Sequence, residues 1–527
     1  MTEDAIFAHA AVAAPHHLAA TAGRDVLLHG GNAIEAMVAM AASIAVVYPH
    51  MNSIGGDGFW LIRDAKGKTR AIEACGFAGE KATREVYEKL GGIPTRGPMA
   101  ALTVPGAIGG WKAALELSAA LGGRLPLADL IGAAVTQGRE GVAVSASEQR
   151  SQPRDGAALY DAPNFRATYF LDGEPPKAGA TRRQVKLADT LAHLGAAGLD
   201  DFYRGDIARE IAADLEELGS PVTRADLKAY EARWREPLSI KTRQATLFNT
   251  PAPTQGLASL MILGIYEKLG IKEIDGVDHA HGLIEAATRA FAHRDRHCVD
   301  FEIATADFDK LLSPALLQAE ADRIDMKRAA PWPLPPEQGD TIWMGAIDGQ
   351  GLAVSYIQSI YWEYGSGVVL PRTGVLMQNR GIAFSLDPAS PRALKPGRRP
   401  FHTLNPALAV FADGRVMSYG SMGGDGQPQF QAQVFTRIAA GDSLASAVAS
   451  PRLLWGRTWG ADSVTVKVEA AYDDAIASGL RRRGHEVERF APERQDAFGH
   501  AGALRRGLKG EIAATHDPRA DGGALGV

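Results

Sequence analysis

The sequence predicts a layered α/β protein, and three observations support that prediction. Helical stretches with apolar residues at spacings of three and four occupy much of the first half of the 527-residue chain. A proline-rich segment at 331–336 then interrupts regular structure, because proline lacks a backbone donor. Beyond it the spacing changes to the period of two that is typical of strands. Since helices and strands must bury their apolar faces against one another, we expect one layered body rather than independent domains.

Helices are expected at 33–48, 108–121, 185–218 and 277–298. The first is almost entirely apolar and is bounded by Gly30-Gly31-Asn32 and Pro49. It contains Glu35 and is shorter than the roughly 20 residues that cross a bilayer. We therefore predict a buried helix and no membrane partner.

Strands are expected at 341–348 and 352–359, joined by a turn at 349–351. If Asp348 pairs with Leu352, opposite residues have numbers that sum to 700, so that Thr341 faces Ser359. Both strands are mostly apolar, as in strands that are covered on both faces. Further strands are predicted at 407–412, 416–420 and 464–468, with a helix at 472–484.

Composition excludes several classes of function. The net charge of -5 comes from 56 basic and 61 acidic residues spread along the chain, which gives no face for nucleic acid. The acidic start, Met1-Thr2-Glu3-Asp4, lacks the pattern of a secretory signal. Two cysteines, Cys75 and Cys298, provide no disulfide framework, as is usual in a reducing cytoplasm. We therefore expect a cytoplasmic protein.

The hairpin places two hydroxyls at one end. If the backbone were cut before Thr341, its hydroxyl would be a nucleophile and its own α-amine, with a pKa near 8, would be the base. Ser359 would orient the nucleophile. From periodicity alone, both residues are ordinary strand residues, since threonine is common in strands.

The run around Thr341 nevertheless resembles the start of the small subunit of gamma-glutamyltranspeptidases. The matching residues are Gly339-Asp340-Thr341, Gln358-Ser359, Gly365-Ser366-Gly367-Val368-Val369, Gly374-Val375-Leu376 and Asn379. Shorter matches keep the same order along the chain, at Gly30-Gly31-Asn32-Ala33, Thr103-Val104-Pro105-Gly106, Pro253-Thr254-Gln255-Gly256 and Asp517-Pro518-Arg519. Thr341 falls on the processing threonine of that family, and Ser359 falls on its second, supporting threonine.

The resemblance implies a four-layer αββα sandwich of the N-terminal nucleophile hydrolase type. It also implies a proenzyme that cuts itself between Asp340 and Thr341 into a large subunit, 1–340, and a small subunit, 341–527, interwoven in one body. No cofactor is implied, and a homodimer of the processed heterodimer is left open. By resemblance, the N–H groups of Gly423 and Gly424 form the oxyanion hole, where glycine lets a tetrahedral centre approach the backbone.

The sequence departs from the family where the glutamyl head group is held. Cys75 stands at an arginine position and Ala383 at an aspartate position; Arg380, Tyr361 and the pair His402-Thr403 replace a glutamine, an asparagine and two serines. Without charge partners, binding the usual donor costs several kcal/mol. Arg380 offers a planar fork for a differently placed carboxylate, with His402 or Thr403 as other anchors. The alternative is that Arg380 only makes a structural ion pair.

The oxamate amidohydrolase branch of the family is similar to this sequence in Gly339-Asp340-Thr341-Ile342-Trp343, Gln358-Ser359-Ile360-Tyr361 and Gln378-Asn379-Arg380-Gly381. This resemblance implies hydrolysis of oxamate to oxalate and ammonia in the use of purine-derived nitrogen. Two alternatives remain: gamma-glutamyl transfer or glutathione hydrolysis, and a catalytically silent scaffold. We expect no metal, because His293 and His297 have the spacing of zinc proteases but Arg294 replaces the required glutamate. This stretch is interpreted as a solvated or ion-paired helix face. The residues 55–58 are interpreted as a tight turn between helix and strand.

Overall fold

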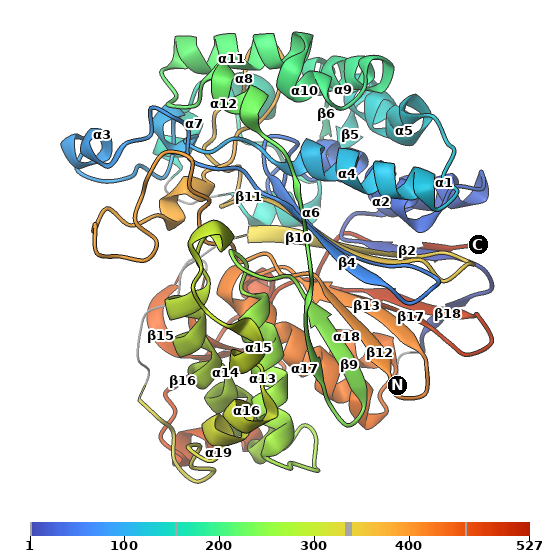
Figure 1. Cartoon of the computed structure of the whole chain (residues 1–527), viewed down its shortest axis with the longest axis vertical. Coiled ribbons are helices and arrows are strands. Elements are labelled where there is room, and N and C mark those ends of the chain that lie inside the picture. Colours follow the sequence, from blue (N-terminus) through green and yellow to red (C-terminus); the bar gives the residue numbers. More distant parts are fainter. Residues whose placement is uncertain (1–2, 153–155, 332–339, 459–460) are drawn as a thin grey trace.

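The computed structural model describes residues 3–152, 156–331, 340–458 and 461–527. In these residues two antiparallel sheets pack face to face, and helices cover the outer face of each, which makes the four layers of Figure 1. No helix in these four stretches is both long enough and apolar enough to cross a membrane. The predicted αββα arrangement is confirmed.

Each sheet draws strands from both halves of the sequence. The first has the order β19 (Gly523–Gly526), β2 (Ala11–Ala14), β10 (Asp340–Ile347), β11 (Ala353–Tyr361), β3 (Asp57–Arg63), β4 (Thr69–Ala74), β7 (Arg233–Arg235). The second has the order β1 (Ala5–Phe7), β18 (Ile512–His516), β17 (Ala501–Arg506), β13 (Val416–Ser421), β12 (Ala407–Phe411), β9 (Ala245–Asn249), β8 (Leu238–Lys241). The prediction of helices in the first half of the chain and strands in the second was therefore too simple.

Helices of the first half cover the first sheet and form the upper part of Figure 1. They are α1 (His17–Leu28), α2 (Ala33–Val47), α4 (Ala107–Ala120), α5 (Leu127–Glu140), α9 (Val185–Ala197), α10 (Asp201–Arg204), α11 (Asp206–Leu218) and α12 (Arg224–Ala229). Shorter helices at this end are α3 (Arg84–Lys89), α6 (Ala146–Arg150), α7 (Ala157–Tyr160) and α8 (Phe165–Tyr169), with the small pair β5 (Val142–Ala143) and β6 (Thr181–Arg182).

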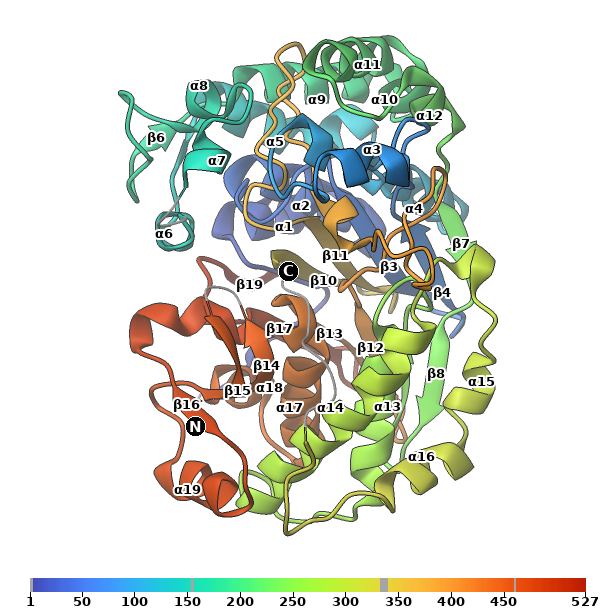
Figure 2. The same ribbon diagram turned by 90° about the vertical axis from the view of Figure 1, so that its left-hand side faces the viewer.

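The second sheet is covered by helices from both halves of the chain. They are α13 (Gly256–Lys268), α14 (Val277–His297), α15 (Phe308–Leu311), α16 (Pro314–Ala321), α17 (Gln427–Ala440) and α18 (Leu444–Ala449). Figure 2 shows α19 (Asp474–Arg482) and the small sheet β14 (Leu453–Thr458), β15 (Ala461–Val468), β16 (Val487–Arg489) on the same side of the molecule. Short 3-10 turns lie at Pro98–Ala100, Phe301–Ile303, Arg380–Ala383, Gly424–Gly426 and Pro492–Phe498.

The three largest apolar clusters of the described residues lie between the four layers. One lies between the first sheet and its helices, and it includes every apolar residue of α2, a helix that is buried along its whole length. A second lies between the second sheet and α13, α14 and α17. A third lies between the sheets, where Trp343, Leu408 and Leu504 are buried. Because each sheet is covered on both faces, its central strands are apolar on both faces.

The predicted helices at 33–48, 108–121 and 277–298 are confirmed as α2, α4 and α14. Asn32 caps α2, and the Glu35 carboxylate accepts from the Asn32 N–H at 2.8 Å, so that polar groups at this buried end are paired. The predicted helical stretch at 185–218 is helical, but it is not one continuous helix. Gly198, at a φ of +95°, and Gly205 end two helices there, and the chain forms α9, α10 and α11 instead.

The hairpin has the predicted register from Ile342, which lies opposite Gln358, to Ile347, which lies opposite Ala353. The Asp348 N–H donates to the Leu352 carbonyl at 3.1 Å, which closes the predicted turn. An irregularity between Asp340 and Ile342 shifts the register by one residue at the end that carries Thr341. The connector predicted at 331–336 lies outside the described residues from 332 onwards.

Candidate functional site

Thr341 and Ser359 meet at the start of the central hairpin. Both side chains are buried, and the Thr341 hydroxyl donates to Ser359 Oγ at 3.3 Å. Ser359 Oγ also accepts from the Tyr361 N–H at 2.9 Å. Gly56 lies against this strand so closely that a Cβ would fall 2.2 Å from the Ser359 carbonyl oxygen. The predicted juxtaposition of the two hydroxyls is confirmed, and Gly56 allows the close approach of the backbones.

Gly423 and Gly424 form a tight turn between β13 and α17. Their φ angles are +118° and +53°, in the region that favours glycine. Within the described part of the chain, neither amide N–H donates to another protein group. The turn leads through Gly424–Gly426 into α17, whose N-terminus favours negative charge. Two N–H donors are thus available at a place suited to an anion.

Packing between the sheets brings this turn toward Thr341. Gly345 faces Leu504, and two residues back along β10 the Trp343 ring faces Gly420, where a Cβ would fall 2.1 Å from the ring. Two residues before Trp343, toward the start of β10, is Thr341. Two residues after Gly420, beyond the end of β13, is Met422. The start of β10 and the glycine turn therefore lie at the same end of the two packed sheets.

A buried polar network that the sequence did not reveal as functional supports the glycine turn. Gln255 Nε2 donates to the carbonyls of Gly424 at 2.8 Å and Thr403 at 2.7 Å. Arg294 donates to Gln255 Oε1 at 3.1 Å and pairs with Asp425 at 2.8 Å. Of the two alternatives predicted for 293–297, a solvated or an ion-paired face, the ion-paired one holds: His293 pairs with Glu320, and the buried Arg294 pairs with Asp425.

Arg380, Tyr361 and Thr403, three of the residues predicted to bind substrate, lie together. The Arg380 guanidinium carbon lies 3.8 Å from the centroid of the Tyr361 ring, and Nη1 donates to the Thr403 hydroxyl at 3.4 Å. All three side chains are buried. Tyr361 has a φ of +83°, an unusual conformation for a bulky residue and one that is typical of functional sites.

His402 lies beside Asp57, a residue for which the sequence predicted only a place in a turn. His402 Nε2 is 3.4 Å from Asp57 Oδ2, and Asp57 Oδ1 accepts from the N–H groups of Gly76 and Gly106 at 3.0 Å each. Asp57 is also the strand partner of Ser359. Burial, and then the charge of Arg380, holds the pKa of His402 well below its ordinary value, so this imidazole is neutral.

Cys75 is the remaining predicted pocket residue. It is buried in the core between the sheets. The next residue, Gly76, donates its N–H to Asp57. Burial raises the pKa of its thiol well above the ordinary value, which makes it a poor nucleophile. Cys75 therefore contributes to the apolar wall behind Asp57. An acid among the glycines at 55–58, at the first residue of a strand, is the sequence signal that could have indicated Asp57.

Comparison with known proteins places the chain in a family. The sequence matches the gamma-glutamyltranspeptidase family over residues 19–527. The chain belongs to the gamma-glutamyltranspeptidase family. It is 50% identical to the oxamate amidohydrolase proenzyme of Klebsiella pneumoniae over 520 residues, covering 98% of each chain. It is 36% identical to the glutathione hydrolase-like YwrD proenzyme of Bacillus subtilis, again with 98% of each covered.

A solved structure supports the same assignment. The crystal structure of cephalosporin acylase from Bacillus halodurans superimposes with a TM-score of 0.91 at 33% identity, covering 100% of this chain and 97% of that one. The chain is thus a hydrolase of the gamma-glutamyltranspeptidase family, with the N-terminal nucleophile fold. In this family member, the residues that differ from the transpeptidase pattern, Arg380, Tyr361, His402 and Thr403, are buried close to the Thr341 hairpin.

The Asp57 carboxyl gives this site a measurable pH dependence. Burial raises its pKa from 3.8 to about 7. Because the folded carboxyl holds its proton more tightly than the unfolded one, the stability it contributes is greatest below about pH 4 and is lost as pH rises to about 7. We expect the thermal unfolding midpoint to fall more steeply between about pH 5 and 7 in the native protein than in Asp57→Asn, whose amide oxygen still accepts both N–H groups.

The control for this prediction is Asp309→Asn, a change of the same chemistry at an exposed position. It should keep the native slope of midpoint against pH. Equal slopes in the native protein and Asp57→Asn would show that Asp57 does not bind its proton more tightly in the folded state.

Proposed function

We propose that this chain is a self-processing amidohydrolase that converts oxamate to oxalate and ammonia through a threonyl ester. The observation that carries the proposal is the contact between the buried hydroxyls of Thr341 and Ser359 at the end of the hairpin. The 50% identity to a protein named oxamate amidohydrolase proenzyme supports the substrate. Processing would divide the precursor into subunits 1–340 and 341–527.

In the processing step, the Thr341 hydroxyl oxygen attacks the carbonyl carbon of Asp340. The bond between that carbon and the Thr341 nitrogen breaks, the nitrogen gains the hydroxyl proton, and an ester joins Asp340 to the Thr341 side chain. Water then hydrolyses the ester, which leaves the Asp340 carboxylate and a free α-amine on Thr341. The new amine is the base that the hydroxyl previously lacked.

In the catalytic step, the α-amine of Thr341 takes the hydroxyl proton and the oxygen attacks the amide carbon of oxamate. The N–H groups of Gly423 and Gly424 stabilise the negative oxygen of the tetrahedral intermediate. The carbon–nitrogen bond breaks, ammonia leaves with the proton from the α-amine, and water releases oxalate by the reverse path. Ser359, which accepts from the Tyr361 N–H, holds the nucleophile in place.

Arg380 is the proposed anchor of the substrate carboxylate. Its stacking on Tyr361 and its bond to Thr403 fix the orientation of the guanidinium, which suits a planar carboxylate. His402 is neutral and therefore does not compete as a second charge. Oxamate carries a carboxylate directly beside its amide and no ammonium group, so that one arginine close to the nucleophile satisfies it.

Gamma-glutamyl hydrolysis is the second candidate, favoured by the 36% identity to a glutathione hydrolase-like protein. A panel of oxamate, glutamine and glutathione separates the two. We expect kcat/KM for oxamate to exceed that for glutamine by at least about 100-fold, because an ammonium group without a partner costs several kcal/mol. Ammonia release measures the amides, and glutamate release measures glutathione. Equal or faster turnover of the gamma-glutamyl compounds would reverse the assignment.

We also propose that the reaction takes place in the cytoplasm. Cys75 and Cys298 are both buried free thiols, in keeping with a cytoplasmic enzyme in a reducing environment. Oxamate hydrolysis would release ammonia in the use of purine-derived nitrogen. Light scattering of the processed protein would establish whether two heterodimers associate.

A further inference from the structure

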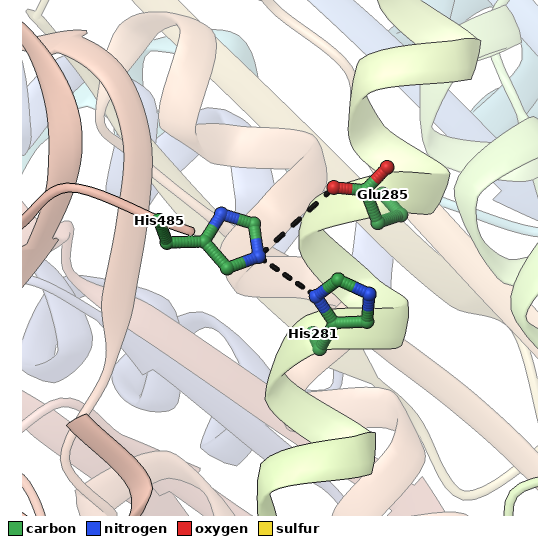
Figure 3. A group of neighbouring side chains, drawn as sticks. All are labelled: His281, Glu285 and His485. Atoms are coloured by element: carbon green, nitrogen blue, oxygen red, sulfur yellow. Dashed lines mark hydrogen bonds and ion pairs between the residues drawn. The ribbon is translucent and has the colours of Figure 1, made fainter. Parts of the chain in front are cut away.

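Three buried side chains that the proposed reaction does not use meet in the helical layer outside the second sheet. His281 and Glu285 lie one turn apart on α14, and His485 approaches them from the segment after α19 (Figure 3). One ligand atom from each lies within 4.8 Å of the other two. Two imidazoles and one carboxylate therefore converge at the first half of α14, whereas Arg294 lies in its last turn.

Hydrogen bonds fix which nitrogen of His281 faces the cluster. His281 Nε2 lies 2.9 Å from the Asp325 carbonyl oxygen, which can only accept, so Nε2 carries the proton. Nδ1 consequently presents its lone pair to His485 Nε2 at 2.7 Å. A histidine that donates its outer nitrogen to a backbone carbonyl and turns the other inward has the arrangement of a metal ligand with its supporting contact.

We propose that His281 Nδ1, His485 Nε2 and Glu285 bind a divalent metal ion of the zinc class. Two imidazole nitrogens and a carboxylate oxygen form a ligand set that zinc accepts, with water at the fourth position. Zinc–nitrogen bonds of about 2.0–2.1 Å place tetrahedral ligands roughly 3.3 Å apart. The two nitrogens, now 2.7 Å apart, would move apart by about 0.6 Å. Glu285 Oε1, now 4.0 Å from His485 Nε2, would move closer.

Metal binding would leave the number of protons on the two imidazoles unchanged. In the metal-free protein, His485 Nε2–H donates to His281 Nδ1; on binding, that proton moves to His485 Nδ1 and Nε2 ligates. Burial lowers the pKa of His485 to about 4, so that the ring is already neutral at pH 7. Burial also raises the pKa of Glu285, and the cation would favour its ionised form.

The ion would have a structural role. The chemistry of amide hydrolysis is provided by Thr341, and the cluster instead links α14 to the segment after α19. The same helix carries Arg294, which pairs with Asp425 beside the glycine turn. A metal at His281, Glu285 and His485 would therefore fix the helix that supports this turn.

The test is zinc binding to the full-length protein after treatment with a chelator. Calorimetry with zinc chloride should show one site per chain. The affinity of this site for zinc should fall at least about 100-fold in His485→Gln and in Glu285→Gln. Zinc should also raise the thermal unfolding midpoint of the native protein by roughly 2–4 °C. The matched control is His293→Gln, which removes a histidine of the partly exposed pair on the same helix and should keep native affinity.

Two results would overturn the proposal. One is the absence of stoichiometric zinc binding by the native protein, in which case the histidines form only a structural hydrogen bond. The other is binding that survives His485→Gln and Glu285→Gln but is lost in His293→Gln, which would place the ion at His293. Circular dichroism of each variant verifies that it is folded.

Discussion

Replacing Thr341 with alanine is expected to leave one uncut chain of 55.9 kDa with at least about 10⁴-fold less amidohydrolase activity. The variant lacks the hydroxyl that attacks Asp340 in processing and the substrate in catalysis, and without processing no α-amine becomes available as base. Denaturing electrophoresis and mass spectrometry measure the first effect, and ammonia release from oxamate measures the second. The native preparation should contain a chain that begins Thr-Ile-Trp-Met.

Two further variants make this experiment specific. Thr341→Ser keeps a hydroxyl and should still be processed, at a reduced rate. Thr246→Ala removes a threonine hydroxyl from β9 in the other sheet and should behave as the native protein. Two subunits in Thr341→Ala would refute Thr341 as the processing residue, and an uncut but active native chain would refute the mechanism. An uncut, inactive native chain would instead indicate the silent scaffold.

Replacing Arg380 with methionine is expected to reduce kcat/KM for oxamate by about 30- to 4,000-fold. Removing one partner of a buried charge pair costs about 2–5 kcal/mol, and each 1.4 kcal/mol corresponds to a factor of ten. Methionine fills much of the space over the Tyr361 ring, so that the loss reports the charge. The measurement is the steady-state release of ammonia.

Oxamide, which carries a second amide in place of the carboxylate, separates binding from structure in this experiment. Arg380→Met should lose far more activity on oxamate than on oxamide, because only oxamate needs the positive charge. Arg380→Lys keeps a charge but not the planar fork, so its activity on oxamate should lie between those of the native protein and Arg380→Met. Equal losses on both substrates would mean that Arg380 maintains the pocket structurally, which is the alternative considered from the sequence.

Local patterns were sufficient to predict the hairpin and the buried helices. A period of two and a three-residue turn fix the register of 342–358, since slipping by one residue would turn every side chain to the other face. The apolar run and its Asn32 cap likewise identified α2. The division of the helical stretch at 185–218 was not predicted, because its helical periodicity continues across Gly198 and Gly205, whose backbone conformations end helices there.

The supporting contacts of the site could not be predicted in this way. Asp57 approaches His402 from 345 residues away, and Gln255 reaches Gly424 across 169 residues. His281 and His485 are separated by 204 residues. No local periodicity encodes such pairs, because they form only when two sheets and their helices pack together.

The sequence by itself determined the family, the hairpin and the pairing of the Thr341 and Ser359 hydroxyls, because strand register is a local property and the motif residues are close in the chain. Only the tertiary structure decided what surrounds those hydroxyls. Packing of one sheet on the other brings the Gly423-Gly424 turn toward Thr341, stacks Arg380 on Tyr361 and buries Asp57 beside His402. Burial then sets the charges of these groups, because the cost of removing an ion from water depends on its neighbours in space rather than in sequence.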